Sequence, residues 1–268
     1  MIKLGVNTVL FKDYSLREAV KAIKAAGFDG MELSAIQGMC EHLPVDEWRS
    51  YKGEIKALSA QYGLELLSME VASLDRERLL KAFEAGAEIG IPIINVGPGG
   101  KADDEDTLKA SLEALAARAE DAAQFGVTLC CKAHVGSAVY STPTTLRMME
   151  AIQSPSFGVD MDPSHIWRAG EKPEEALPSV ISRVKHIHIR DCKGNGPEPG
   201  PASLQACGRG NIDLFGYFKA MVDSGYDGPV CLEVIDDNVD LLQAAVVAAE
   251  SRGYMNACLK KLGAREDK

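Results

Sequence analysis

Short apolar runs alternate along the whole chain with longer segments in which apolar residues recur every three or four positions. The first pattern is typical of buried strands and the second of amphipathic helices, so the alternation indicates repeated βα units. We expect strands over residues 2–8, 30–34, 64–71, 91–97, 127–134, 156–162, 184–191 and 228–234.

Capping residues mark the ends of the predicted helices. The segment 15–27 begins at Ser15, carries Glu18 three residues later as in a capping box, and stops at Gly27. A second predicted helix covers 106–126 and stops at a glycine too. Since about eight βα units in a chain of this length close into a barrel, we predict an α/β fold, a (β/α)8 TIM barrel, as a single domain over residues 1–268.

Composition narrows the class of partner. The net charge of −10 would repel a phosphate backbone, which disfavours nucleic acid. No apolar run approaches a membrane span and the first residues lack a signal-peptide layout, so we expect no membrane partner and a cytoplasmic location. The seven cysteines include no CxxC pair, which favours reduced thiols. A small molecule is the expected partner, and the apolar helix faces are compatible with a homo-oligomer.

Ionisable residues collect at the ends of the predicted strands, where a TIM barrel keeps its active site. Charged side chains on buried parallel strands are costly unless they are paired or bind a metal, so the clustering favours a functional site. The residues concerned are Glu32, Glu70, Lys132, His134, Asp160, Asp162, His186, His188, Arg190, Asp191 and Glu233.

Three of these residues form a candidate metal site. Asp162, His188 and Glu233 end successive strands and converge if their sides of the strands face the barrel axis. Imidazole and carboxylate ligands suit a divalent ion such as Mn, Mg, Co or Zn.

Five stretches, in this order and spacing, resemble the xylose-isomerase-like TIM barrels, which include sugar phosphate isomerases and epimerases, inosose dehydratase and AP-endonuclease-like proteins. They are FDGMEL (28–33), GVDMDPSH (158–165), VKHIHIRD (184–191), GRGNID (208–213) and YDGPVCLEV (226–234). The resemblance covers essentially the whole chain.

The resemblance implies a divalent metal held by a glutamate, an aspartate, a histidine and a second glutamate from strands five to eight. Asp162, His188 and Glu233 match the last three positions. The strand-five stretch is CKAH, so Lys132 stands where the family has its first glutamate. Because an ammonium cannot ligate a metal, either His134 completes the site or no metal binds tightly.

The activity implied is that of a divalent-metal-dependent sugar or keto-sugar isomerase or epimerase. Such an enzyme transfers a proton next to a carbonyl through an enediolate, here with Glu233 and Lys132 as the catalytic residues. Because Lys132 replaces a carboxylate, two alternatives stay open: a sugar dehydratase or other lyase acting by β-elimination, and a metal-free binding protein or complex subunit. A DNA-repair role ranks last, because it would want a basic groove.

Further polar residues near the strand ends are candidates for substrate contacts. His165, Arg190, Glu32 and Glu70 are the predicted substrate-binding residues, with salt bridges as the alternative for the charged ones. Asp191 either orients His188 or caps the following loop. That loop, residues 192–213, is rich in glycine and proline and long enough to be a functional lid.

Overall fold

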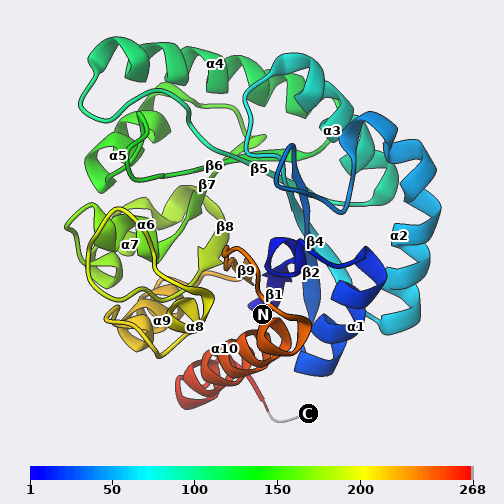
Figure 1. Cartoon of the computed structure of the whole chain (residues 1–268). Helices are drawn as coiled ribbons and strands as arrows, with labels where there is room; N and C mark the ends of the chain where they lie inside the picture. The colour runs from blue at the N-terminus through cyan, green and yellow to red at the C-terminus, as the bar shows by residue number, and fades with distance from the viewer. Residues whose placement is uncertain (267–268) are drawn as a thin grey trace.

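A computed structural model describes residues 1–266 of the chain. Within these residues, eight parallel strands form a central barrel and the helices surround it (Figure 1). The barrel strands are β1 (Lys3–Asn7), β2 (Gly30–Ile36), β4 (Glu65–Glu70), β5 (Ile93–Val96), β6 (Thr128–Lys132), β7 (Phe157–Met161), β8 (Val184–Ile189) and β9 (Pro229–Leu232).

The barrel closes through β1, which pairs in parallel with both β9 and β2. Gly5 of β1 is in register with Gly30 on one side and with Cys231 on the other. A short strand, β3 (Cys40–Glu41), adds an antiparallel pair to the end of β2. The predicted TIM barrel is therefore confirmed.

Helices follow the strands as the sequence predicts. They are α1 (Leu16–Ala26), α2 (Trp48–Tyr62), α3 (Arg76–Ile89), α4 (Glu105–Ala123), α5 (Thr142–Ala151), α6 (Pro163–Arg168), α7 (Pro173–Val180), α8 (Ala202–Gln205), α9 (Leu214–Asp223) and α10 (Leu241–Lys261), with 3-10 turns at η1 (Thr8–Phe11), η2 (Val45–Glu47) and η3 (Ile181–Arg183). The capping box of Ser15 and Glu18 is present, and Gly27 ends α1 with a φ of 85°, a conformation that glycine adopts readily.

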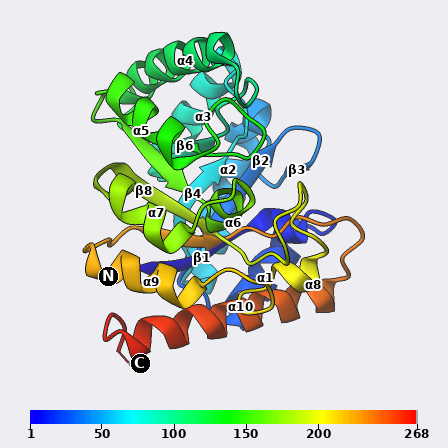
Figure 2. The ribbon, with the colours of Figure 1, turned by 90° about the vertical axis from the view of Figure 1, so that its left-hand side faces the viewer.

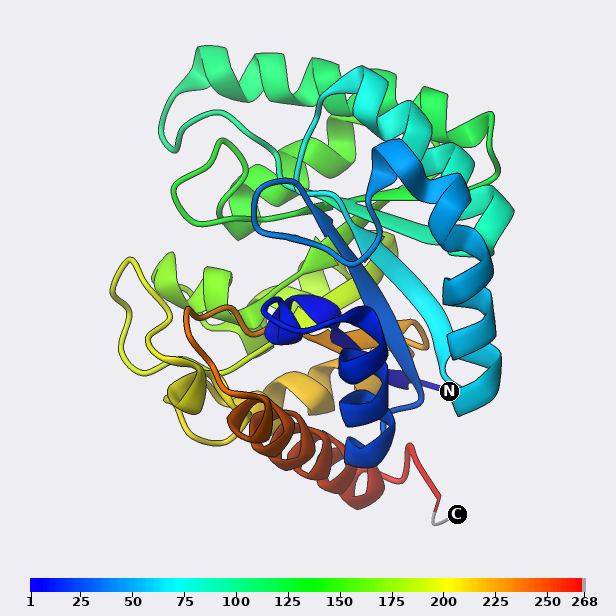
Figure 3. The same ribbon diagram turned by 45° about the vertical axis from the view of Figure 1, so that its right-hand side comes forward.

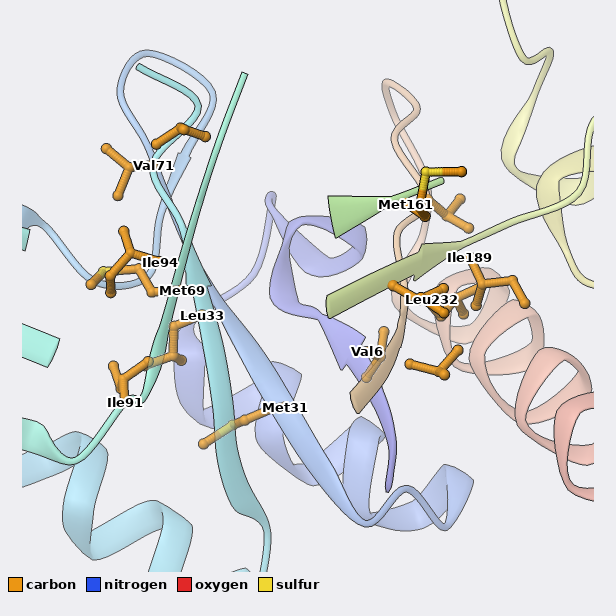
Figure 4. Packing of buried hydrophobic residues seen from close by; sticks show 14 of the residues in the cluster. Val6, Met31, Leu33, Met69, Val71, Ile91, Ile94, Met161, Ile189 and Leu232 are labelled. Carbon is orange, nitrogen blue, oxygen red and sulfur yellow. The ribbon is translucent and has the colours of Figure 1, made fainter. Parts of the chain in front are cut away.

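Side chains alternate along each strand between the helices and the barrel interior. The side chains that face the helices are apolar. Figure 4 shows Leu33, Met69 and Ile94 in one group, and Ile189 with Leu232 in another. Each has a polar neighbour in sequence that is also buried: Glu32, Glu70, Asn95, His188 and Glu233. Alternation therefore gives the barrel an apolar outer surface and a polar interior.

Loops after the strands gather on one side of the barrel. Figures 2 and 3 show the loop before α8 and the segment after β9 on this side, and Figure 3 adds the loops after β5 and β6. No helix within residues 1–266 is both long and apolar enough to cross a membrane.

The strand over 127–134 is shorter than predicted. β6 ends at Lys132, because a turn follows in which Ser137 N–H donates to the His134 carbonyl and His134 N–H donates to the Val139 carbonyl. Gly136 supplies the positive φ of 85° in that turn. The predicted strand boundary at residue 134 is therefore wrong, and His134 lies in the turn.

Candidate functional site

Polar side chains inside the barrel form a connected network, here called the inner polar layer. Asn95 and Asn7 each donate an amide hydrogen bond to Glu32, at 2.6 and 3.0 Å. On the other side, His186 contacts the Ser68 hydroxyl through Nε2 and Asp160 through Nδ1, at 2.9 and 3.0 Å. The layer consists of Asn7, Glu32, Ser68, Asn95, Asp160, His186 and His188, all of which are buried.

His188 is held by a carboxylate on each side. Its Nδ1 lies 2.6 Å from Oδ2 of Asp160, and its Nε2 hydrogen bonds with Glu32. Burial alone would lower the pKa of His188, but the charges of Asp160 and Glu32 raise it well above its usual value. The two carboxylates therefore favour the imidazolium form of His188, with Nε2 donating to Glu32 and Nδ1 beside Asp160.

Lys132 lies at the centre of a second group of charged side chains, next to this layer. Its Nζ donates to Oε1 of Glu233 at 2.7 Å and to Oε1 of Glu70 at 3.1 Å, and lies 3.4 Å from Nδ1 of His188. Burial opposes the ammonium form, but the carboxylates of Glu233 and Glu70 raise the pKa of Lys132 above its ordinary value. The lysine is therefore a buried cation, which leaves it unable to act as a nucleophilic amine.

The two carboxyl groups on Lys132 differ in their affinity for protons. Burial and the nearby charge of Glu233 raise the pKa of Glu70 to about 8. Burial also opposes ionisation of Glu233, but the charges of Lys132 and His188 hold its pKa well below the usual range. At neutral pH the pair comprises a protonated Glu70 and an ionised Glu233.

Arg190 lies beside the pair, just after β8. Its Nε donates to the Ser164 hydroxyl at 2.8 Å, and its terminal nitrogens lie 3.3 Å from Asp162 and 3.6 Å from Glu233. Asp162 also caps α6 by accepting from Ser164 N–H at 2.8 Å. Together Glu70, Lys132, Asp162, Arg190 and Glu233 are called the mouth cluster.

Two carboxylate oxygens of the mouth cluster lack a hydrogen bond among the described residues, Oδ2 of Asp162 and Oε2 of Glu233. Glu233 lines a cavity of about 360 Å³ together with Glu70, Lys132 and Arg190, whereas Asp162 lies behind its wall. Buried unsatisfied oxygens facing a cavity are available to a ligand.

The remaining predicted residues are spread over both levels. Glu32 was predicted to contact substrate. It lies in the inner polar layer and lines neither of the two cavities near the strand ends. His134 is exposed at the rim, where its ring lies 4.1 Å from the ring of His165. Asp191 accepts the backbone N–H groups of Cys192, Gly208 and Ile212, which favours its predicted role as a cap of the loop.

A family model described as the xylose isomerase-like TIM barrel matches residues 20–258, most of the chain. The chain belongs to this family. Among its curated relatives, an inosose dehydratase of Clostridium perfringens is 23% identical, with 88% of this chain and 91% of the relative covered. The L-ribulose-5-phosphate 3-epimerase UlaE of Salmonella typhi is also 23% identical, covering 92% and 90%.

A solved structure, the IOLI protein with a bound zinc atom, superposes with a TM-score of 0.79 over 97% of this chain and 99% of that chain, at 16% identity. This similarity confirms the fold. The curated relatives of this chain thus include both a dehydratase and an epimerase.

Donor groups spaced closely enough for a metal ion occur inside the barrel, and most of them belong to the inner polar layer. Three sets of ligand atoms each lie within 4.8 Å of one another. The sets are Glu32, His186 and Cys231; Asp160, His186 and His188; and Glu32, Glu70 and His188.

The set predicted from the sequence, Asp162, His188, Glu233 and His134, is not among the groups so spaced in residues 1–266. Both nitrogens of His188 are engaged by carboxylates, and the Lys132 ammonium bonds Glu233 directly. Arg190 supplies a second cation beside Asp162. In this arrangement the residues do not fit a divalent metal, because the Lys132 and Arg190 side chains already supply the positive charge that a metal would bring.

The sequence analysis missed several contributors, among them Asn7, Ser68, Asn95, Ser164 and Arg168. Asn7, at the end of β1, links Glu32 to Glu70 through its amide, and inspection of the first strand's end would have found it. Arg168, on α6, contacts His165. Its only sequence signal is its position one helical turn after that histidine.

Proposed function

We propose that this protein is an enzyme acting on a sugar or keto-sugar, and that it removes a proton next to the carbonyl and expels a β-hydroxyl as water. The observation that carries the proposal is the buried ammonium of Lys132 between Glu233 and Glu70, two carboxyl groups with opposite proton affinities. Two titratable groups whose environments separate their pKa values are the arrangement expected of an acid and base pair.

Glu233 serves as the base in this proposal. Its carboxylate is ionised, its Oε2 has no hydrogen-bond partner among the described residues, and it lines the cavity beside Lys132. A free, ionised oxygen can accept the proton on the carbon next to the carbonyl.

Lys132 serves as the electrostatic partner of the reacting carbonyl. Two of its three ammonium hydrogens are engaged by Glu233 and Glu70. The third is available to the substrate oxygen, on which negative charge develops when the proton leaves. A preorganised cation in a buried site stabilises such a charge.

Glu70 serves as the acid. With a pKa of about 8, it retains its proton at neutral pH and lines the same cavity. The C–H proton passes to Glu233, the C–O bond at the β-carbon breaks, and the departing hydroxyl takes the proton of Glu70. The products are water and an unsaturated ketone, as expected of a dehydratase such as the inosose dehydratase to which the chain is similar.

Isomerisation or epimerisation is the second candidate, favoured by the similarity to UlaE along 92% of this chain. One base can carry a proton between adjacent carbons, so Glu233 alone suffices for isomerisation. Epimerisation needs a proton acceptor and a donor on opposite faces of one carbon, whereas the acceptor Glu233 and the donor Glu70 both bond to the same Lys132 ammonium. The elimination therefore uses more of the cluster. No step in either reaction is derived through a metal.

Mass spectrometry of products tests the proposal. Purified protein is incubated with inosose and with open-chain keto-sugars, neutral and anionic, with and without added Mn or Zn. We expect a product lighter by one water without added metal. A product of unchanged mass would favour the isomerase, and turnover of no substrate under either condition would contradict both.

A further inference from the structure

A second cavity, of about 630 Å³, adjoins the mouth cluster on the side of the loop before α8. His134, His165 and Arg190 line both cavities, so the two are adjacent and share a wall. Arg168 of α6 lines only the second. Two guanidinium groups thus lie in the wall of a space next to the cavity of the proposed acid and base.

Arg168 has no carboxylate partner within 4.0 Å among residues 1–266. Its Nε donates to the carbonyl of Ser164 at 3.1 Å and its Nη1 donates to that of Pro197 at 2.6 Å. Its Nη2 lies 2.9 Å from Nδ1 of His165. The side chain is fixed by neutral acceptors, so no carboxylate pairs directly with its charge, and those of Asp162 and Glu198 act on it only from a greater distance.

His165 connects the two arginines. Its Nδ1 accepts the N–H of Val135 at 3.2 Å, so in the neutral imidazole Nε2 carries the hydrogen. Nη2 of Arg190 lies 2.9 Å from that Nε2, where two N–H groups meet. Burial and the charge of Arg190 lower the pKa of His165 well below its usual value, which agrees with the neutral ring.

The carboxylate oxygen nearest to these donors is Oδ2 of Asp162. It lies 3.3 Å from Arg190 and 3.6 Å from His165 Nε2, and it has no hydrogen bond. Donors at this point therefore outnumber the acceptors that reach them. An oxyanion entering from the cavity would satisfy the N–H groups that the protein leaves facing one another.

We propose that Arg168, Arg190 and the Nε2–H of His165 bind an oxyanion carried by the substrate, so that the enzyme acts on a sugar acid or a sugar phosphate rather than on a neutral sugar. This inference rests on the proposed function for the reaction, but the oxyanion site itself stands on the contacts of the two arginines.

Acidic residues at the outer edge of the cavity are engaged elsewhere. Asp236 accepts the backbone N–H groups of Ala202 and Asp237, and Asp237 pairs with Lys12. Glu198 is exposed on the loop. These carboxylates repel an anion from the rim, whereas the arginines attract it to the wall.

Binding of three probes with the same six-carbon skeleton tests the site: D-glucose, D-gluconate and D-glucose 6-phosphate, measured by calorimetry. We expect at least one anionic probe to bind about tenfold or more tighter than glucose, as charge-assisted hydrogen bonds require. The tighter of the two anions identifies carboxylate or phosphate as the group recognised. Equal binding of all three, or no binding of either anion, would overturn the inference.

Variants locate the binding. Arg168→Gln is expected to weaken the tighter anion about tenfold, and Arg168→Lys less, because charge is kept while the guanidinium geometry is lost. Arg147→Gln, which removes an exposed arginine paired with Glu105, is the matched control and leaves binding unchanged. Anion binding by Arg168→Lys and Arg168→Gln that equals wild type would contradict the site.

The Glu233→Gln protein separates this inference from the proposed reaction. It keeps Arg168 and Arg190 and is expected to bind the anion at least as tightly as wild type, because a nearby negative charge is gone. If anion binding holds while no sugar is turned over by wild type, the reaction is wrong and the site stands. If sugars are turned over but no anion binds, the reaction stands and the site is wrong.

Discussion

The inner polar layer and the mouth cluster are both made of buried charges, yet their contacts differ. In the inner polar layer, His188 lies between Glu32 and Asp160, and no residue of the layer lines either of the two cavities at the barrel mouth. In the mouth cluster, Glu233 keeps an oxygen without a hydrogen bond and lines a cavity. The inner charges are therefore enclosed and stabilise the barrel, whereas most charges of the mouth cluster border a space that a ligand can enter.

The mouth cluster should control turnover. Replacing its base, Glu233→Gln, is expected to lower kcat by about 10²- to 10⁴-fold, the usual contribution of a general base. Steady-state kinetics on the substrate that wild type turns over, with exposed Glu105→Gln as the control, measures the loss. A Glu233→Gln protein with full turnover would sink the assignment of the base.

The inner polar layer should control stability. Asp160→Asn removes a carboxylate bonded to both His186 and His188, and is expected to lower the free energy of unfolding by about 3–5 kcal/mol, as for a broken buried ion pair. Urea denaturation at neutral pH measures the change.

The matched variant in the mouth is Glu233→Gln, for which we expect a smaller loss of about 1–2 kcal/mol. Lys132 then keeps Glu70, which can ionise once Glu233 no longer opposes it. An equal or larger loss for Glu233→Gln than for Asp160→Asn would remove the distinction between the two regions.

Glu70 should make stability depend on pH. Its pKa in the folded state is about 8 and its ordinary value is 4.5, so folding holds the proton more tightly than the unfolded chain does. The stabilisation is complete below pH 4.5 and is lost as the pH rises toward 8, by up to about 1.4 kcal/mol per pH unit.

Denaturation of wild type and Glu70→Gln between pH 5 and 8 measures this dependence. The variant cannot titrate at this position, so its stability should fall less across the range. Parallel curves for the two proteins would show that Glu70 ionises normally in the fold.

Local sequence patterns were sufficient to predict the barrel. Alternating apolar runs, the capping box at Ser15 and glycine stops at helix ends act over a few residues, and the strands that they predict agree with the structure to within a few residues. β6, β8 and β9 each end before the predicted residue, and for β6 the reason is a turn at Gly136 whose backbone hydrogen bonds are not visible in the hydrophobic pattern.

The pairing of the site residues could not be predicted in the same way. Lys132 contacts Glu70 and Glu233, which are 62 and 101 residues away in the sequence, and the strand register decides which of its neighbours it reaches. Strand-end position identified these residues as candidates. It did not separate the level of His188 from that of Asp162, which is why the predicted ligand set includes residues from both.

The central claim is that the Lys132 ammonium supplies the positive charge at the mouth in place of a divalent metal. Elemental analysis tests it directly, on wild type, Lys132→Glu and the surface control Lys219→Glu, each incubated with Zn or Mn and then desalted. We expect little metal in wild type and the control, and about one ion per chain in Lys132→Glu, where the carboxylate restores a ligand. About one ion per chain in wild type, with no gain in Lys132→Glu, would contradict the claim.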